Sequence, residues 1–207
     1  MKMKHYVLTL LIMSCFSIYG QSTWILDKPH SSIGFEVDHI IALSEISDAE
    51  QDFTLGVTRG QFTDYSISFF PGKEDLTGSK VEAVIRVGSV DTENDPRDAY
   101  LKSAQFFDVE NYPTMKFVST SFEHIKDNQY KLKGNLTIKG ITKPIELDVQ
   151  YSGKSPNPQE NDYISFTATG LLYRNEYGLV WGDALEKGGF RISYYVKLNI
   201  QANFYRK

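Results

Sequence analysis

The sequence contains a single cysteine, Cys15, which lies in an apolar segment close to the N-terminus. Once that segment is removed, the chain has no thiol. It then forms no disulfide, holds no metal ion through a thiolate and has no cysteine nucleophile. Its stability must therefore come from packing and hydrogen bonds alone, which a closed barrel supplies.

The chain also lacks an excess of positive charge, because its formal net charge is -4. Without Lys2 and Lys4 of the N-terminal segment, 20 basic residues remain against 26 acidic ones, a net charge of about -6. An acidic surface argues against nucleic acid as a partner and against electrostatic binding to anionic lipid head groups.

No comfortable membrane span is evident, because the apolar run 6–19 is short and polar sequence follows it at once. Two lysines precede the run and Gly20 follows it, as in a secretory signal cleaved near that glycine. We therefore predict a signal peptide at 1–20 and a single domain at 21–207. The protein is then periplasmic or secreted and has no stable membrane span after signal removal. An uncleaved anchor helix and lipidation at Cys15 are the alternatives.

The chain is rich in aromatic residues, with 13 Tyr and 13 Phe, and this composition favours strands over helices. Apolar and polar residues alternate with a period of two in many segments. One-sided alternation of this kind predicts antiparallel strands with one buried face. The apolar faces are Ile33-Phe35-Val37-His39, Val81-Ala83-Ile85-Val87, Tyr130-Leu132-Gly134-Leu136-Ile138, Ile145-Leu147-Val149-Tyr151 and Ile192-Tyr194-Val196-Leu198-Ile200.

Turn-forming residues separate these runs, and we count eight or nine strands. Two segments interrupt the alternation. Residues 45–52 are acidic and predict a short helix or a loop, whereas 91–112 contains a short helical segment near 95–105. We expect that segment to dock Phe106 and Phe107 on one end of a barrel. The predicted fold class is all-β, with eight antiparallel strands forming the barrel.

An eight-stranded barrel is just wide enough for its own side chains or for one small ligand. The predicted inward faces are almost wholly apolar and include the small residues Ala83, Gly134, Ala168 and Gly170. Small residues either leave space for a ligand or only relieve crowding where strands bend, and the residues alone leave both open. A ligand in such a cavity is apolar, and each methylene it buries contributes about 0.8 kcal/mol before ordering costs.

Three histidines remain beyond the N-terminal segment, and their spacing offers no metal site. His30 and His39 differ in parity, so they point to opposite faces of a strand. For the same reason His30 is no base for the adjacent Ser31, and a turn or cap at 27–32 is the better interpretation. His39 lies on the apolar face. It is either a core residue whose ring is hydrogen-bonded within the protein or a residue in contact with a ligand head group. We predict no catalytic residue, no metal site and no cofactor.

Six blocks of the sequence, in this order, resemble the YceI-like family of periplasmic, polyisoprenoid-binding, lipocalin-like proteins. The blocks are WILDKPHSSIGFEVDH at 24–39, RGQF at 59–62, DPRDAYLKS at 95–103 with FFD at 106–108, YPTMKF at 112–117, GNLTIKGITKP at 134–144 and RNEYGL at 174–179. They cover essentially all of the chain after the N-terminal segment. The resemblance implies a lipocalin-like barrel of eight antiparallel strands that holds an isoprenoid or similar amphiphile lengthwise and has no catalytic machinery.

The resemblance and the alternating faces together predict which residues line the ligand, although each is otherwise ordinary barrel core. They are Phe35, Val37, His39, Phe62, Phe106, Phe107, Phe117, Leu136 and Ile138. The chain departs from the family at 43–57, where a longer connection is expected to form a lid or reshape the mouth. It departs again at Tyr100, where the family often has histidine and where a contact with the head group is expected to differ.

The predicted function is therefore to hold or transport a prenyl-chain lipid after export, and the protein is predicted not to be an enzyme. Two alternatives stay open. An enzyme acting on a lipid inside the barrel requires a general acid or base near the pocket, for which His39 is the evident candidate. A ligand-free structural or interaction module is the other alternative. Either a monomer or a homodimer fits the sequence.

Overall fold

The computed structural model describes residues 24–41, 53–156, 162–180 and 190–206. The predicted signal peptide and the acidic segment 45–52 lie outside these ranges. The elements in chain order are β1 (Ile25–Leu26), η1 (Lys28–His30), β2 (Ser32–Ile41), β3 (Phe53–Phe62), β4 (Tyr65–Phe70), β5 (Lys80–Arg86), η3 (Val87–Ser89), β6 (Val90–Asp91), α1 (Asp95–Lys102), β7 (Thr114–Lys126), β8 (Gln129–Ile138), β9 (Ile141–Pro156), β10 (Asp162–Tyr173), η4 (Arg174–Tyr177) and β11 (Phe190–Arg206).

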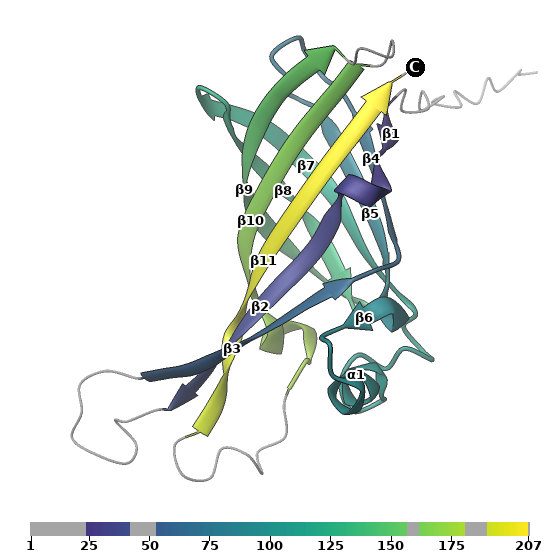
Figure 1. Cartoon of the computed structure of the whole chain (residues 1–207), viewed down its shortest axis with the longest axis vertical. Coiled ribbons are helices and arrows are strands. Elements are labelled where there is room, and N and C mark those ends of the chain that lie inside the picture. The colour runs from purple at the N-terminus through teal and green to yellow at the C-terminus, as the bar shows by residue number, and fades with distance from the viewer. Residues whose placement is uncertain (1–23, 42–52, 157–161, 181–189, 207) are drawn as a thin grey trace, which may run out of the picture.

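The described strands form one curled, eleven-stranded antiparallel sheet, which confirms the all-β class (Figure 1). Its order is β4-β5-β7-β8-β9-β10-β11-β2-β3-β6, and β1 pairs with β11. The count differs from the predicted eight for two physical reasons. β1 and β6 are two-residue pairings at the ends of β11 and β3, and β3 and β4 are one strand bent at Thr63–Asp64. The bent strand pairs with β2 before the bend and with β5 after it, so it closes the barrel.

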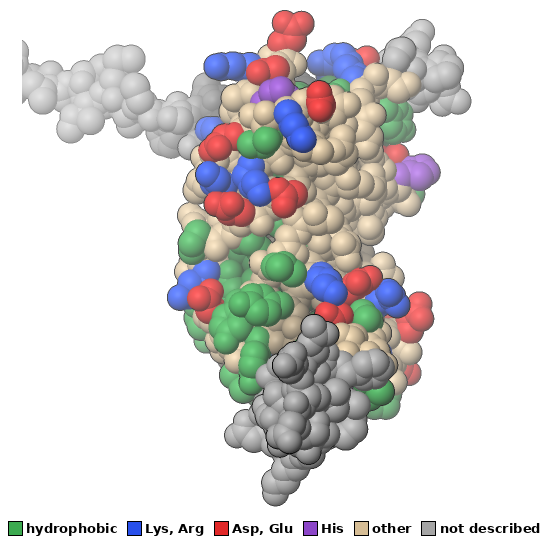
Figure 2. Space-filling view, turned by 90° about the vertical axis from the view of Figure 1, so that its left-hand side faces the viewer, with side chains coloured by type: hydrophobic (Ala, Val, Ile, Leu, Met, Phe, Trp, Pro, Cys, Tyr) green, Lys and Arg blue, Asp and Glu red, His purple; other side chains and the backbone are tan. Residues whose placement is uncertain are grey.

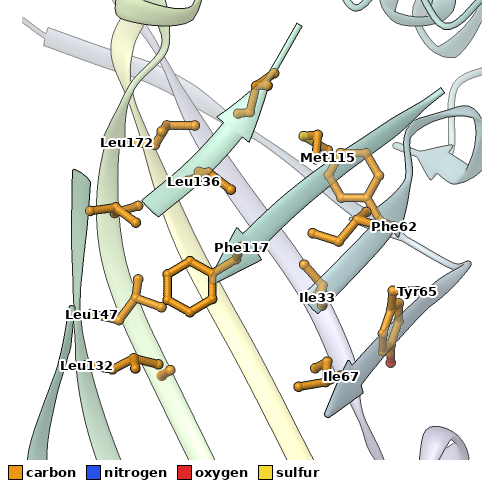
Figure 3. Packing of buried hydrophobic residues seen from close by; sticks show 14 of the residues in the cluster. Ile33, Phe62, Tyr65, Ile67, Met115, Phe117, Leu132, Leu136, Leu147 and Leu172 are labelled. Atoms are coloured by element: carbon orange, nitrogen blue, oxygen red, sulfur yellow. The ribbon is translucent and has the colours of Figure 1, made fainter. Parts of the chain in front are cut away.

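Alternation along the strands gives the barrel its apolar interior, as predicted. On β8, Tyr130, Leu132, Gly134, Leu136 and Ile138 are buried, while the residues that alternate with them face outward. The ladders bring the buried faces of neighbouring strands into register, with Phe117 opposite Leu136. Figure 3 shows the resulting cluster, in which side chains from strands all round the barrel point toward one another.

The predicted helical segment is α1, which lies at the lower end of the barrel in Figure 1. Asn94 caps the helix, because its side chain accepts a hydrogen bond from the backbone N–H of Arg97 at 3.0 Å. The chain after the helix buries Phe106 and Phe107, as expected, and the Phe107 ring packs edge-on against Phe62 with ring centroids 6.1 Å apart. No helix within the described ranges is long and apolar enough to cross a bilayer.

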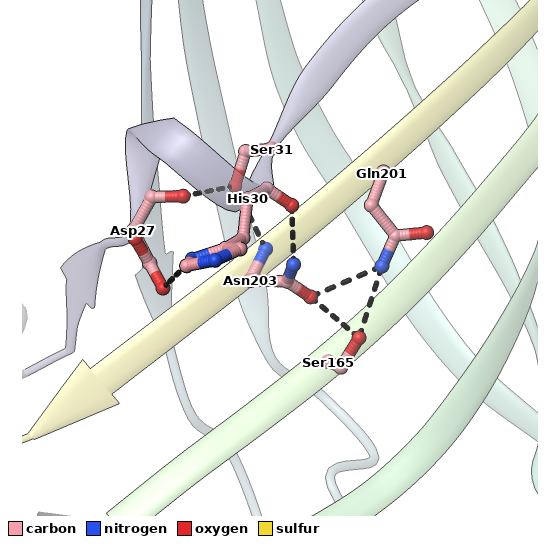
Figure 4. A network of polar contacts seen from close by, with 6 residues as sticks. All are labelled: Asp27, His30, Ser31, Ser165, Gln201 and Asn203. Atoms are coloured by element: carbon pink, nitrogen blue, oxygen red, sulfur yellow. Dashed lines mark hydrogen bonds and ion pairs between the residues drawn. The ribbon is translucent and has the colours of Figure 1, made fainter.

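The turn expected at 27–32 lies at the other end of the barrel and joins β1 to β2 (Figure 4). The Ser31 hydroxyl donates to the Asp27 carbonyl at 2.8 Å, and the His30 ring pairs with the Asp27 carboxylate at 2.8 Å. Asn203 of β11 donates its backbone N–H to the Ser31 hydroxyl at 3.0 Å and its side-chain amide to the His30 carbonyl. His30 and Ser31 therefore fasten this turn to the barrel.

Two of the four small inward residues relieve crowding, and two leave space. A Cβ on Gly134 would lie 2.4 Å from the Phe117 ring, and one on Gly170 would lie 2.5 Å from a methyl carbon of Leu147. These glycines let larger side chains lie across them. Ala83 and Ala168, in contrast, line open space inside the barrel. The structure thus assigns each of the two interpretations to a different pair of residues.

Substitution of Gly134 by alanine should destabilise the protein by about 1–3 kcal/mol, because its Cβ would overlap the Phe117 ring and approach the Val118 carbonyl oxygen to 2.7 Å. Gly56→Ala is the matched control, since a Cβ on this strand glycine meets nothing within 4 Å. Urea unfolding measures the loss of stability of each variant as a shift of the unfolding midpoint, with the dependence of the free energy on urea concentration unchanged. Equal midpoint shifts for the two variants would contradict the packing role of Gly134.

Candidate functional site

The barrel encloses a cavity of about 800 Å³. Its wall includes residues from every strand of the described barrel except the two-residue β1 and β6, and from α1 and η4. Five of the described lining residues are polar: His39, Thr58, Thr92, Arg97 and Arg174. All the others are aliphatic or aromatic, so the cavity suits an apolar molecule of ordinary ligand size.

All nine residues expected to contact a ligand lie on this wall. Seven of them come from strands β2, β3, β7 and β8, and Phe106 and Phe107 come from the turn after α1. Their placement follows from strand parity and from the docking of that turn. Their contact with a ligand stays a prediction. Tyr100 is not part of the wall, and its ring packs on Phe106 with centroids 6.2 Å apart.

Aromatic rings fill one end of the cavity. Phe69, Phe122, Phe166 and Phe204 are buried, with Phe69 and Phe204 only 1% and 2% exposed. The Phe69 ring lies 5.2 Å from that of Phe166 and 5.5 Å from that of Phe204, centroid to centroid. Tilted rings at these separations pack favourably. We call these four residues the aromatic end.

The opposite end carries a group of hydrogen-bonded polar side chains, which we call the polar cluster: His39, Thr58, Thr92, Arg97 and Asp98. The His39 Nε2 lies 2.8 Å from the Thr58 hydroxyl. Arg97 Nε donates to the Thr92 hydroxyl at 2.8 Å, and that hydroxyl donates to Asp98 at 2.5 Å. The backbone N–H of Thr92 also donates to the Asp98 carboxylate, at 3.0 and 3.2 Å. The cluster joins β2, β3 and the start of α1 at one place on the wall.

Arg174 reaches the same end from η4, although only 3% of it is exposed. Its guanidinium donates to the backbone carbonyls of Leu179 at 2.6 Å, Ser193 at 3.0 Å and Ile192 at 3.2 Å. The β11–β2 register shifts between Ile192 and Val196, and a bulge of this kind removes backbone groups from the ladder. Arg174 therefore supplies donors where the sheet cannot. Ile192 is also the register partner of His39, which brings Arg174 close to the polar cluster.

The cavity reaches solvent beside the polar cluster. Leu55 lines the cavity but is 58% exposed, and it lies where the β2–β3 register shifts between His39 and Ile40. We call this end, marked by Leu55, the polar cluster and Arg174, the mouth. Residues 53–57 of the long connection expected at 43–57 belong to β3 and extend the hairpin there, whereas 43–52 lie outside the described residues.

The outer wall carries hydrophobic side chains near the same end. Figure 2 shows them gathered on the lower part of the molecule, while charged side chains dominate the upper part. Leu171 and Tyr195 are 60% and 55% exposed, and Tyr173 packs against Tyr195 with ring centroids 5.3 Å apart. These residues belong to the outward faces of β10 and β11.

Sequence reasoning missed four of the polar residues on the wall: Thr58, Thr92, Arg97 and Arg174. Their positions depend on which segments meet at the mouth, and strand parity does not report that. The signal that pointed nearest to them is the block DPRDAYLK, which contains Arg97 and Asp98. Within the described part of the chain, no three His, Cys, Asp or Glu residues are grouped so that they could hold a metal ion.

The profile of the YceI-like domain matches residues 24–204 of the sequence. The chain belongs to the YceI-like family. This YceI-like protein is 33% identical to a UPF0312 protein of Staphylococcus epidermidis over 179 residues, which are 86% of this chain and 94% of the relative. It is 29% identical to a UPF0312 protein of Staphylococcus aureus over 184 residues, covering 88% and 97% of the two chains.

Solved structures share the fold of this YceI-like protein. The Campylobacter jejuni YCEI protein matches with a TM-score of 0.64 at 26% identity, over 77% of this chain and 91% of that one. Burkholderia cenocepacia BcnA matches with a TM-score of 0.68 at 17% identity, over 86% and 98% of the chains. A polyisoprenoid binding domain from Saccharophagus degradans matches with a TM-score of 0.58 at 16% identity, over 90% and 100%. The curled lipocalin-like sheet is therefore the family's fold.

The turn that carries Arg174 gives the YceI-like protein a specific dependence on pH. Burial raises the pKa of Tyr177 in η4 to about 12, and the nearby Glu176 adds to the shift. The unfolded chain ionises this phenol near pH 10, so its contribution to stability is complete below pH 10 and is lost as pH rises through about 12. Tyr177→Phe should remove that loss, which amounts to roughly 2–3 kcal/mol. Urea unfolding of both proteins between pH 9 and 12 measures it, and parallel curves would contradict it.

Proposed function

We propose that this YceI-like protein binds an isoprenoid or a similar long-chain amphiphile lengthwise in its barrel. The observation that carries the proposal is the cavity of about 800 Å³, apolar along most of its wall. A ten-carbon chain buried there gains roughly 8 kcal/mol before ordering costs, which allows useful affinity without a charged contact. The Saccharophagus degradans protein of the same fold is described as polyisoprenoid-binding, which supports the assignment.

The proposal includes export and a carrier role. The N-terminal pattern of two lysines, an apolar run and Gly20 supports delivery to the periplasm or the cell exterior. An isoprenoid chain is poorly soluble in water, so a protein that encloses it can move it between membranes. The mouth gives such a chain a path into the barrel at one end.

The role proposed is binding and not catalysis. His39 is the general acid or base that a lipid-modifying enzyme of this shape would use. Its Nε2 is engaged by the Thr58 hydroxyl, and no carboxylate of the described residues hydrogen-bonds to its ring. A catalytic histidine commonly needs such a partner to orient it and to stabilise its charged form. His39 fits better as a polar contact at the mouth.

Organic extraction of the protein purified from its own host, followed by mass spectrometry, tests the proposal directly. We expect about one long-chain lipid per protein molecule. The same extract from protein that has been delipidated under denaturing conditions and refolded is the control and should contain none. Absence of a stoichiometric lipid in the first sample would count against a carrier.

A larger side chain inside the cavity should weaken binding without unfolding the barrel. Ala83→Phe places a ring in the lumen, whereas Val84→Phe places it on the outer face of the same strand. If the inner ring displaces three methylenes of the ligand, it costs about 2.4 kcal/mol, or roughly 50-fold in Kd. Titration with farnesol measures both variants against the wild type. Equal Kd values for the two variants would place the ligand outside the barrel.

A further inference from the structure

The cavity of this protein is polar at one end only. The polar cluster and Arg174 supply every polar side chain among the described lining residues, and all of them lie at the mouth. The aromatic end offers nothing but ring and methyl surface. An amphiphile in this cavity therefore has one favourable direction, with its tail toward the aromatic end and its head at the mouth. This step rests on the proposed function and asks which head the mouth accepts.

Arg97 has donors left for a ligand. A guanidinium carries five N–H groups. Nε and Nη2 donate to Thr92, at 2.8 and 2.9 Å, and Nη1 lies 3.5 Å from the Thr58 hydroxyl, too far for a strong bond. No carboxylate in the described part of the chain forms an ion pair with it. Arg97 is thus held in place by Thr92 while part of its fork lines the cavity.

Arg97 places a guanidinium charge on the described part of the wall at the mouth, although the protein as a whole is acidic. The one carboxylate of the polar cluster, Asp98, is buried and accepts three hydrogen bonds from Thr92. Its lone pairs are therefore largely used within the cluster. Next to an apolar cavity, the Arg97 guanidinium attracts an anion more strongly than it would in water.

We propose that the mouth binds the anionic head group of the amphiphile, a phosphate monoester or a carboxylate. Arg97 forms the direct contact, since a guanidinium fork matches either group in a bidentate geometry. The Thr58 hydroxyl and His39 lie beside it and contact the remaining oxygens. Arg174 is tied to three backbone carbonyls and forms part of the wall beside the cluster. The mouth thereby selects acidic isoprenoids over neutral ones of the same length.

The test compares farnesyl monophosphate, farnesoic acid and farnesol, three probes with one tail and different heads, below their micelle-forming concentrations. Calorimetric titration should show that the wild-type protein binds the two anions about tenfold or more tightly than the alcohol. Arg97→Gln should remove most of that preference and leave the Kd of farnesol nearly unchanged. A preference for only one of the two anions identifies the head as phosphate or carboxylate.

Arg59→Gln is the matched control. Arg59 follows Thr58 on β3, but its side chain is 72% exposed and pairs with Glu36 on the outer wall. The variant removes the same charge next to the cluster, so it should keep the wild-type preference. Within one variant, a loss of folded protein or of cavity volume affects the Kd values for the anion and the alcohol alike. The ratio of the two Kd values therefore reports only the head-group preference.

Three outcomes would overturn the head-group proposal. In the first, the wild type binds farnesol as tightly as both anions, which leaves the apolar carrier intact and removes only the head-group site. In the second, Arg97→Gln and Arg59→Gln change the ratio equally, so that the effect is long-range charge. In the third, no probe binds at all, and the proposed function fails together with the inference.

Discussion

The alternation of side chains along a continuous hydrogen-bonded ladder is the constraint on which the cavity depends. From β5 round to β2, each long strand pairs with a neighbour on both sides. Its register is therefore fixed by two ladders of hydrogen bonds. A slip of one residue would turn a whole apolar face to water. The bend at Thr63–Asp64 then lets one strand pair at both margins of the sheet. Once the sheet is curled shut, the inward faces have only one another and the enclosed space to contact.

The two ends of that space would act on the proposed ligand through different physical interactions. Apolar burial has no direction and scales with area, so the aromatic end and the aliphatic wall select for length and bulk. Hydrogen bonds depend on distance and angle, so the polar cluster selects for the position and chemistry of one group. A barrel apolar at both ends would hold a chain in either direction. The asymmetry of this one would give the proposed amphiphile a single direction.

Period-two patterning was enough to predict the class of the fold and one face of each strand. Phe35, Val37 and His39 all line the cavity because they alternate along β2, and the extra residues of the irregular β11–β2 pairing lie on β11, between Ile192 and Val196. The same reasoning did not separate Gly134 from Ala83, because it does not show which larger neighbour lies across a small residue. It also missed Arg97 and Thr58, which are 39 residues apart and meet only when α1 docks against β3.

A backbone irregularity explains why a buried guanidinium, that of Arg174, lies at the mouth. The registers of β2–β3 and β11–β2 both shift beside His39, at the same level of adjacent strands. A regular ladder satisfies its own carbonyls and has no need of a buried guanidinium. The irregularity in β11 leaves carbonyls that require donors, and Arg174 meets that need from inside the protein. The cost of interrupting the sheet is thus offset by a cation, and that cation lies where the cavity opens.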